Sequence, residues 1–97
     1  MASRVALTTK PDQATNVELI AANDDRVGLL ITNSSDQILY IRLGGTAATT
    51  TTGHTWRLAI NGGQIDLSNL SGRCWKGAVQ GIWATGSTGA ANITELT

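Results

Sequence analysis

His54 is the only histidine in this chain of 97 residues, so it is the first candidate for acid–base chemistry. A histidine base needs a nucleophile within hydrogen-bond reach and usually a carboxylate that orients the ring. No local motif around His54 supplies either group. We therefore interpret His54 as a residue at the beginning of a strand, and we expect no enzymatic activity. A small hydrolase stays as an alternative, which would require His54 to meet a carboxylate and a hydroxyl in a pocket.

Cys74 is the only cysteine, and it lies between Arg73 and Lys76. Neighbouring positive charge can lower the pKa of a thiol, but a lone cysteine is most often a small buried hydrophobic residue. One Cys and one His are too few for a zinc site. No calcium-binding loop is present, because Asp24 and Asp25 form a charged turn without further oxygen ligands in sequence. The sequence thus predicts neither a metal nor a cofactor.

Three tryptophans stand in a chain that has no phenylalanine. Trp56, Trp75 and Trp83 could together form an aromatic platform for a sugar. Without Phe, we instead expect them to fill the core or a contact between subunits. A carbohydrate-binding module remains an alternative interpretation of these side chains.

Composition excludes several other classes of function. Seven basic residues balance seven acidic residues, so the chain lacks the positive charge with which proteins bind a phosphate backbone, and nucleic acid is not an expected ligand. No apolar run approaches the roughly 20 residues that a membrane-spanning helix needs. The N-terminus has no apolar core typical of a signal peptide. We expect one soluble domain, made in a cytoplasm, without a membrane partner.

Alternation of apolar and polar residues predicts strands throughout the chain. In the segment 37–43, for example, Leu39, Ile41 and Leu43 share one face. The same pattern predicts Val27, Leu29 and Ile31, then Trp56, Leu58 and Ile60, and then Ile65 and Leu67 as inward residues. The predicted strands are 17–22, 27–33, 37–43, 54–60, 64–70, 78–85 and 92–96, with a weaker one at 4–8. This pattern predicts an all-β, single-domain antiparallel β-sandwich or barrel of about seven to eight short strands.

Turns and irregular segments divide the strands. The sequence Asn-Ser-Ser-Asp at 33–36 is typical of a hairpin loop, and 61–63 and 86–89 are also predicted turns. Residues 1–15 are polar, contain the only proline, Pro11, and predict an N-terminal arm. Residues 16–97 form the predicted sandwich domain, with a Thr-rich loop at 44–53.

Some predicted strands carry apolar residues on both faces. Leu30 lies opposite the main apolar stripe of its strand, and Ile38 and Tyr40 do the same in the next strand. A sandwich needs only one apolar face per sheet, so a second apolar face predicts a cover from another subunit or another protein. Low charge fits this interpretation, because the centres of interfaces are depleted in charged residues.

These features together resemble a type of small all-β structural protein found in tailed bacteriophages. The resemblance covers about residues 25–97. Its motifs are an arginine before an apolar strand (Arg26, then Val27 to Ile31), the Asn-Ser-Ser-Asp turn, Tyr40 to Gly44 followed by a Gly/Ala/Thr loop, Gly62 to Leu67, and Gly81 to Ala84 before a short last strand.

The resemblance implies a virion protein, most plausibly a capsid decoration or cement protein. Such proteins bind outside the head as small oligomers, here a dimer or trimer, and hold neighbouring subunits of the major capsid protein together. A component of the neck, tail or fibre attachment is the alternative within the same class. The resemblance brings no catalytic residue. The Thr-rich loop can lie flat against another protein, or it can be a solvated loop without a partner. The candidate contact residues are Ile38, Tyr40, Arg42, Thr49, Thr50, Thr51, Thr52 and Pro11.

Overall fold

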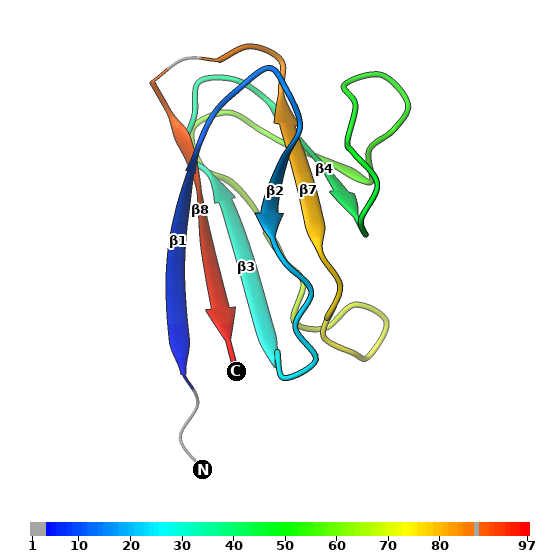
Figure 1. The fold of residues 1–97 in the computed structure, drawn as a ribbon. Coiled ribbons are helices and arrows are strands. Elements are labelled where there is room, and N and C mark those ends of the chain that lie inside the picture. The colour runs from blue at the N-terminus through cyan, green and yellow to red at the C-terminus, as the bar shows by residue number, and fades with distance from the viewer. Residues whose placement is uncertain (1–3, 87) are drawn as a thin grey trace.

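Eight strands in two antiparallel sheets make up the fold in the computed structural model, which describes residues 4–86 and 88–97. The strands are β1 (Val5–Pro11), β2 (Val17–Ile20), β3 (Gly28–Asn33), β4 (Leu39–Leu43), β5 (Trp56–Leu58), β6 (Gly63–Asp66), β7 (Val79–Trp83) and β8 (Ala90–Leu96). The sheets have the strand orders β1-β8-β3-β6 and β2-β7-β4-β5 (Figure 1). The predicted all-β sandwich is confirmed. The described ranges contain no helix that is long and apolar enough to cross a membrane.

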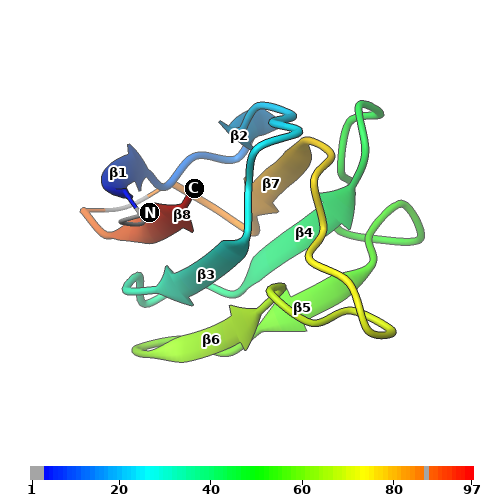
Figure 2. The same ribbon diagram turned by 90° about the horizontal axis from the view of Figure 1, so that it is seen from below.

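The core lies between the two sheets, which Figure 2 shows as separate layers. Leu39 and Ile41 of β4 face Leu29 and Ile31 of β3 across this layer, and all four are fully buried. The alternation predicted for these strands is therefore confirmed. Trp83 of β7 is the largest fully buried side chain. In a chain without Phe, Trp83 is thus the aromatic side chain that fills the core between the sheets.

Three residues expected in the core are exposed instead. Val27, Trp56 and Ile60 are 57%, 41% and 46% exposed. Val27 precedes the first residue of β3, Trp56 begins a strand of three residues at the edge of its sheet, and Ile60 lies in the turn after that strand. Alternation places a side chain on the inner side, but it buries the side chain only where the opposite sheet extends over it.

The connections differ from the prediction in one respect. The segment 33–36 was expected to be a hairpin loop, but β3 and β4 belong to different sheets, so this segment crosses from one layer to the other. The turn at 61–63 also joins the two sheets, and it contains Asn61 and Gly62 at φ 55° and 118°, as the Asn-Gly sequence predicts. Within the described strands, the hairpin between neighbours is β4–β5, and its loop is the Thr-rich segment.

The weaker strand predicted at 4–8 is confirmed and runs further than expected, so the expected N-terminal arm at 1–15 is wrong for residues 5–11. These residues form β1, which pairs in register with β8 from Val5 opposite Leu96 to Pro11 opposite Ala90. The Val-Ala-Leu-Thr-Thr segment has high β-propensity, and β8 offers it a complete row of backbone partners. Residues 1–3 of the expected arm lie outside the described residues.

Gly89 allows the last crossing between the sheets. A Cβ on Gly89 would lie 2.4 Å from Cα of the buried residue Ser35, whereas a Cβ on Gly45 would meet nothing within 4 Å. Gly89→Ala is therefore expected to lower the free energy of unfolding by about 1–3 kcal/mol, because the backbone of Ser35 must move. Gly45→Ala is the matched control and is expected to change it by less than about 0.5 kcal/mol. Urea unfolding of both variants measures the difference, and equal stabilities would contradict the proposed clash.

Candidate functional site

The outer face of the sheet β2-β7-β4-β5 carries most of the sequence-predicted contact residues. Tyr40 pairs in register with Arg57 of β5 on one side and with Ile82 of β7 on the other, so these side chains share one face. Arg42 follows on the same face of β4. Tyr40, Arg42 and Ile82 are half-buried, and Arg57 is exposed. We call these four residues, together with Ile38, the contact face.

The Thr-rich loop is a closed turn that is fixed at its base. The N–H of Thr49 donates to the carbonyl of Gly53 at 2.9 Å, and the N–H of Gly53 donates to Oγ1 of Thr49 at 2.8 Å. Ala48 is only 2% exposed, and its N–H donates to Oδ1 of Asn16 at 2.9 Å. The loop therefore has a hydrophobic anchor and a polar anchor, while residues 49–52 are exposed.

His54 joins this loop to the contact face. Its Nδ1 lies 3.1 Å from the carbonyl oxygen of Thr49, and its ring meets the edge of Tyr40 at 4.9 Å between centroids. A carbonyl oxygen only accepts, so Nδ1 carries the proton in the neutral ring. Arg42 also donates from Nη1 to the carbonyl of Ala47, at the long distance of 3.4 Å. The structure thus brings Tyr40, Arg42 and Thr49–Thr52 together on one side of the molecule.

The remaining predicted contacts lie elsewhere. Pro11 ends β1, which belongs to the other sheet. The second apolar face predicted from the sequence is in fact two surfaces, because Leu30 and Thr32 lie on the outer face of the sheet β1-β8-β3-β6, and Ile38 and Tyr40 lie on the opposite outer face. Two faces on opposite sides of a sandwich cannot be covered by a single flat contact.

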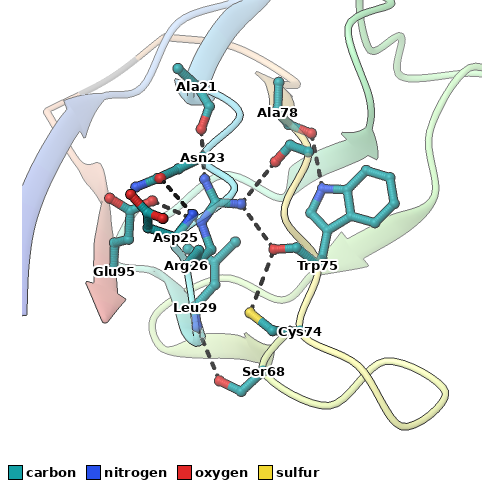
Figure 3. A network of polar contacts seen from close by, with 11 residues as sticks. Ala21, Asn23, Asp25, Arg26, Leu29, Ser68, Cys74, Trp75, Ala78 and Glu95 are labelled. Carbon is teal, nitrogen blue, oxygen red and sulfur yellow. Dashed lines mark hydrogen bonds and ion pairs between the residues drawn. The ribbon is translucent and has the colours of Figure 1, made fainter. Parts of the chain in front are cut away.

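Arg26 forms a buried network that the sequence did not predict (Figure 3). Its side chain is fully buried, and its Nε donates to a carboxylate oxygen of Glu95 at 2.8 Å. Nη1 donates to the carbonyls of Trp75 and Gly77 at 2.9 and 2.8 Å, and Nη2 donates to the carbonyl of Ala21 at 2.6 Å. One guanidinium therefore joins the segments before β3, before β7 and after β2 to the last strand. An arginine directly before an apolar strand was its only signal in sequence.

A hollow of about 590 Å³ lies beside this network. Its lining includes Arg73, Cys74, Lys76 and Ser68. Cys74 is half-buried, and its Sγ lies 3.6 Å from the carbonyl of Trp75, while the two cations are exposed. The hollow is positively lined, but exposed cations on flexible side chains do not fix the orientation of a ligand.

Asp66 is a carboxyl whose pKa is clearly shifted. The hydroxyl of Ser68, and then its backbone N–H, hold the pKa of Asp66 below its ordinary value of 3.8. A folded-state pKa below the unfolded one contributes stability above pH 3.8, and this contribution is lost as the pH falls through the folded pKa. Because Asp66 is exposed, the lowered pKa comes from its hydrogen bonds with Ser68 in a local turn and not from burial.

The three tryptophans do not form the sugar platform considered above. Trp83 is fully buried, and Trp75 is half-buried with its Nε1 donating to the carbonyl of Ala78 at 3.1 Å. Trp56 alone presents a large exposed surface. Sugar-binding sites built on stacking need accessible rings, so this arrangement gives little support to a carbohydrate-binding module.

The geometry around the ionisable residues also gives no catalytic constellation within residues 4–86 and 88–97. The ring of His54 contacts the carbonyl of Thr49 and the phenol ring of Tyr40. No group of three or more His, Cys, Asp or Glu side chains in the described part could hold a metal ion. Comparison of the chain with family models, with curated proteins and with solved structures gave no match.

Proposed function

We propose that this protein is a structural component of a tailed-phage virion, and specifically a decoration or cement protein that binds the outside of the head. The proposal has two supports. One is the resemblance of the sequence to tailed-phage structural proteins. The other is the Thr-rich loop, which is held in place by hydrogen bonds and lies beside the contact face. The second observation carries the proposal, because a pre-ordered loop loses little conformational entropy when it binds.

The chemistry of the contact face suits a protein partner. Tyr40 and Ile82 offer apolar area, and Arg42 and Arg57 offer donors around it. Tyr and Arg are enriched in the energetically dominant parts of interfaces. The hydroxyls and methyl groups of Thr50, Thr51 and Thr52 add contact area without the desolvation cost of charges. The expected partner is the major capsid protein, with acidic or neutral surface opposite the arginines.

The proposed mechanism is mechanical. A ligand that binds only the assembled shell stabilises that shell by mass action. If the protein is an oligomer, several weak contacts with neighbouring capsid subunits combine through effective concentration. In this proposal the protein is made in the host cytoplasm and is located on the virion. A neck, tail or fibre-attachment position would use the same contact face on a different partner.

A triple variant in which Thr50, Thr51 and Thr52 become alanine tests the contact role of the loop. It keeps the Thr49 hydroxyl that closes the turn and the buried anchor Ala48. We expect the dissociation constant for emptied phage heads, measured by co-sedimentation, to rise by about tenfold, because the three side chains together need to contribute only about 1.4 kcal/mol for that change.

A control variant and a second loop variant make this experiment specific. Thr88→Ala, in the exposed loop before β8, is expected to leave head binding unchanged. Asn16→Ala removes the acceptor of the Ala48 N–H without changing the exposed threonines, so it is expected to weaken binding by loosening the loop. Unchanged binding of the triple variant would remove the loop from the interface. Binding to tails but not to heads would favour the neck or tail alternative, and binding to neither would refute the proposal.

A further inference from the structure

Strand β1 is an edge strand that contributes nothing to the core. Within the described residues the edges of the two sheets are β1 and β6 in one and β2 and β5 in the other (Figure 1). β2 and β5 supply the buried residues Leu19 and Leu58, and β6 supplies Ile65, which packs against the core. No residue of β1 belongs to this core or packs against it. Something other than apolar packing therefore attaches β1 to the sandwich.

Both faces of β1 are open to solvent. Thr8 lies opposite the buried Ile93 of β8, so the even-numbered residues of β1 point toward the side of the core. Ala6 and Thr8 are nevertheless exposed, so the other sheet does not extend over β1. Val5 and Leu7, on the outer side, are already 63% and 77% exposed. Release of the strand therefore transfers little further apolar surface into water, and its hydrophobic cost is small.

The attachment of β1 is a ladder of backbone hydrogen bonds to β8. Arg4 and Thr97 exchange both bonds at 3.0 Å, and the bonding direction alternates along an antiparallel strand, so the even-numbered residues of β1 bond to the odd-numbered residues of β8. On its other side, β8 accepts at Ala90 from the N–H of Ser34 at 2.8 Å, so its even-numbered residues bond to β3. Each bond to β1 stabilises the closed strand only modestly, because water replaces it on opening.

The attachment changes in character at Asp12. The carboxylate of Asp12 is buried and accepts a hydrogen bond from the hydroxyl of Ser35 at 2.5 Å. The next residue, Gln13, accepts at its carbonyl from the N–H of the buried Trp83 at 3.0 Å. From Asp12 onward the chain is thus tied to buried groups, whereas the residues up to Pro11 are not.

We propose that β1 opens from the sandwich as one unit, from Arg4 to Pro11, while the other strands stay folded. The released segment recovers the conformational entropy that pairing removes. The open state has β8 as the edge of a three-stranded sheet, β8-β3-β6, with the odd-numbered N–H and C=O groups of β8 free. The protein therefore contains a second pairing edge that the closed strand covers. This inference does not depend on head binding, which uses the other sheet.

Native-state hydrogen exchange of the full chain, followed by NMR at low urea concentrations, tests the opening. We expect the even-numbered amides of β1 and the odd-numbered amides of β8 to exchange together. Their protection factors should be at least about a hundredfold smaller than those of Asn92 and Thr94, whose N–H groups bond to β3. The exchange should also depend weakly on urea, because local opening exposes little surface.

Two results of this experiment would overturn the proposal. Equal protection of neighbouring odd and even amides in β8 would show that β1 opens only together with the core. Protection that rises step by step from Ala6 to Lys10 would show fraying from the end of the strand instead of opening as a unit.

A reversible lock provides a second test. Leu7 and Thr94 are a pair without mutual backbone bonds, so their Cα atoms lie about 4.5 Å apart, within the range of about 4.4–6.8 Å that a disulfide spans. In a Cys74→Ser background, we expect oxidised Leu7→Cys with Thr94→Cys to raise the protection of the odd-numbered β8 amides to that of Asn92. The reduced form of the same variant is the matched control and should exchange as wild type does. Identical exchange in the oxidised and reduced forms would contradict the opening of β1.

Discussion

Arg26→Met is expected to lower the free energy of unfolding by about 3–5 kcal/mol, the range for removing one partner of a buried ion pair. The substitution leaves the carboxylate of Glu95, whose side chain is only 15% exposed, without its cation. It also leaves the carbonyls of Ala21, Trp75 and Gly77 without the donors that now satisfy them. Methionine fills a volume similar to that of arginine, so little cavity forms. The lost free energy of unfolding therefore measures mainly the missing polar contacts of Arg26.

Urea unfolding followed by circular dichroism measures this change. Arg42→Met is the control, because Arg42 is half-exposed and its bond to Ala47 is long, so we expect a change of less than about 1 kcal/mol. The double variant Arg26→Met with Glu95→Gln separates the two contributions. It removes the unpaired charge but not the unsatisfied carbonyls, so we expect only partial recovery. A loss below 1 kcal/mol for Arg26→Met would show that the network is not a main source of stability.

Asn33→Asp is expected to lower the free energy of unfolding by at least about 3 kcal/mol at pH 7, since each buried polar group left unsatisfied costs about 1–3 kcal/mol and a charged group costs more. Asn33 is fully buried. Its Nδ2 donates to the carbonyls of Gln37, Leu58 and Ala59 at 2.8, 3.2 and 3.1 Å. A carboxylate would direct an oxygen at those three carbonyl oxygens. Its other oxygen can still accept from Nε1 of Trp83, as the amide does at 3.1 Å.

The loss should depend on pH in a defined direction. Burial and the facing carbonyls raise the folded-state pKa of the introduced carboxyl above its unfolded value of about 4. The part of the penalty that comes from charge is therefore absent below that unfolded pKa, where the carboxyl is neutral in both states, and only the loss from its missing N–H donors remains. The part from charge grows as the pH rises toward the folded pKa and is constant above it.

The comparison is made with wild type at each pH, by urea unfolding followed through tryptophan fluorescence. Asn92→Asp is the matched control, because Asn92 is an exposed strand asparagine that bonds to the side chains of Thr9 and Ser34. We expect its effect to be below about 1 kcal/mol and nearly independent of pH. A pH-independent loss for Asn33→Asp would show that the three carbonyls relax away from the carboxylate.

The hydrogen bonds of Asn33 explain why the sequence predicted the strands but not the path of the chain between β3 and β4. The burial of Leu39, Ile41, Leu29 and Ile31 follows from period-two alternation, which is a local property. The path of the chain after Asn33 is not local. It depends on the side-chain amide of Asn33, which bonds to the carbonyls of residues 37, 58 and 59. The sequence Asn-Ser-Ser-Asp is therefore compatible both with a hairpin and with a crossing between sheets.

The candidate site was also predicted only in part, because alternation is local and the contacts of the loop are not. Tyr40 and Arg42 were placed correctly on one face, because alternation assigns them opposite to Leu39 and Ile41. The contact of the Thr-rich loop with that face through His54 was not predicted, since it requires the loop to close on itself between Thr49 and Gly53. The burial of Arg26 was also missed, because its partner Glu95 lies far along the chain.

By itself, then, the sequence determined that this chain forms short antiparallel strands around one apolar core, with turns at its Asn and Gly residues. Hydrophobic spacing and turn chemistry act over a few residues, so they can be read in order along the chain. Only the tertiary structure decided which strands are neighbours, that the N-terminal strand extends to Pro11 and pairs with β8, and that the second apolar surface is two surfaces on opposite sides. Those outcomes depend on contacts between distant residues, whose backbone and side-chain partners exist only once the sheets have assembled.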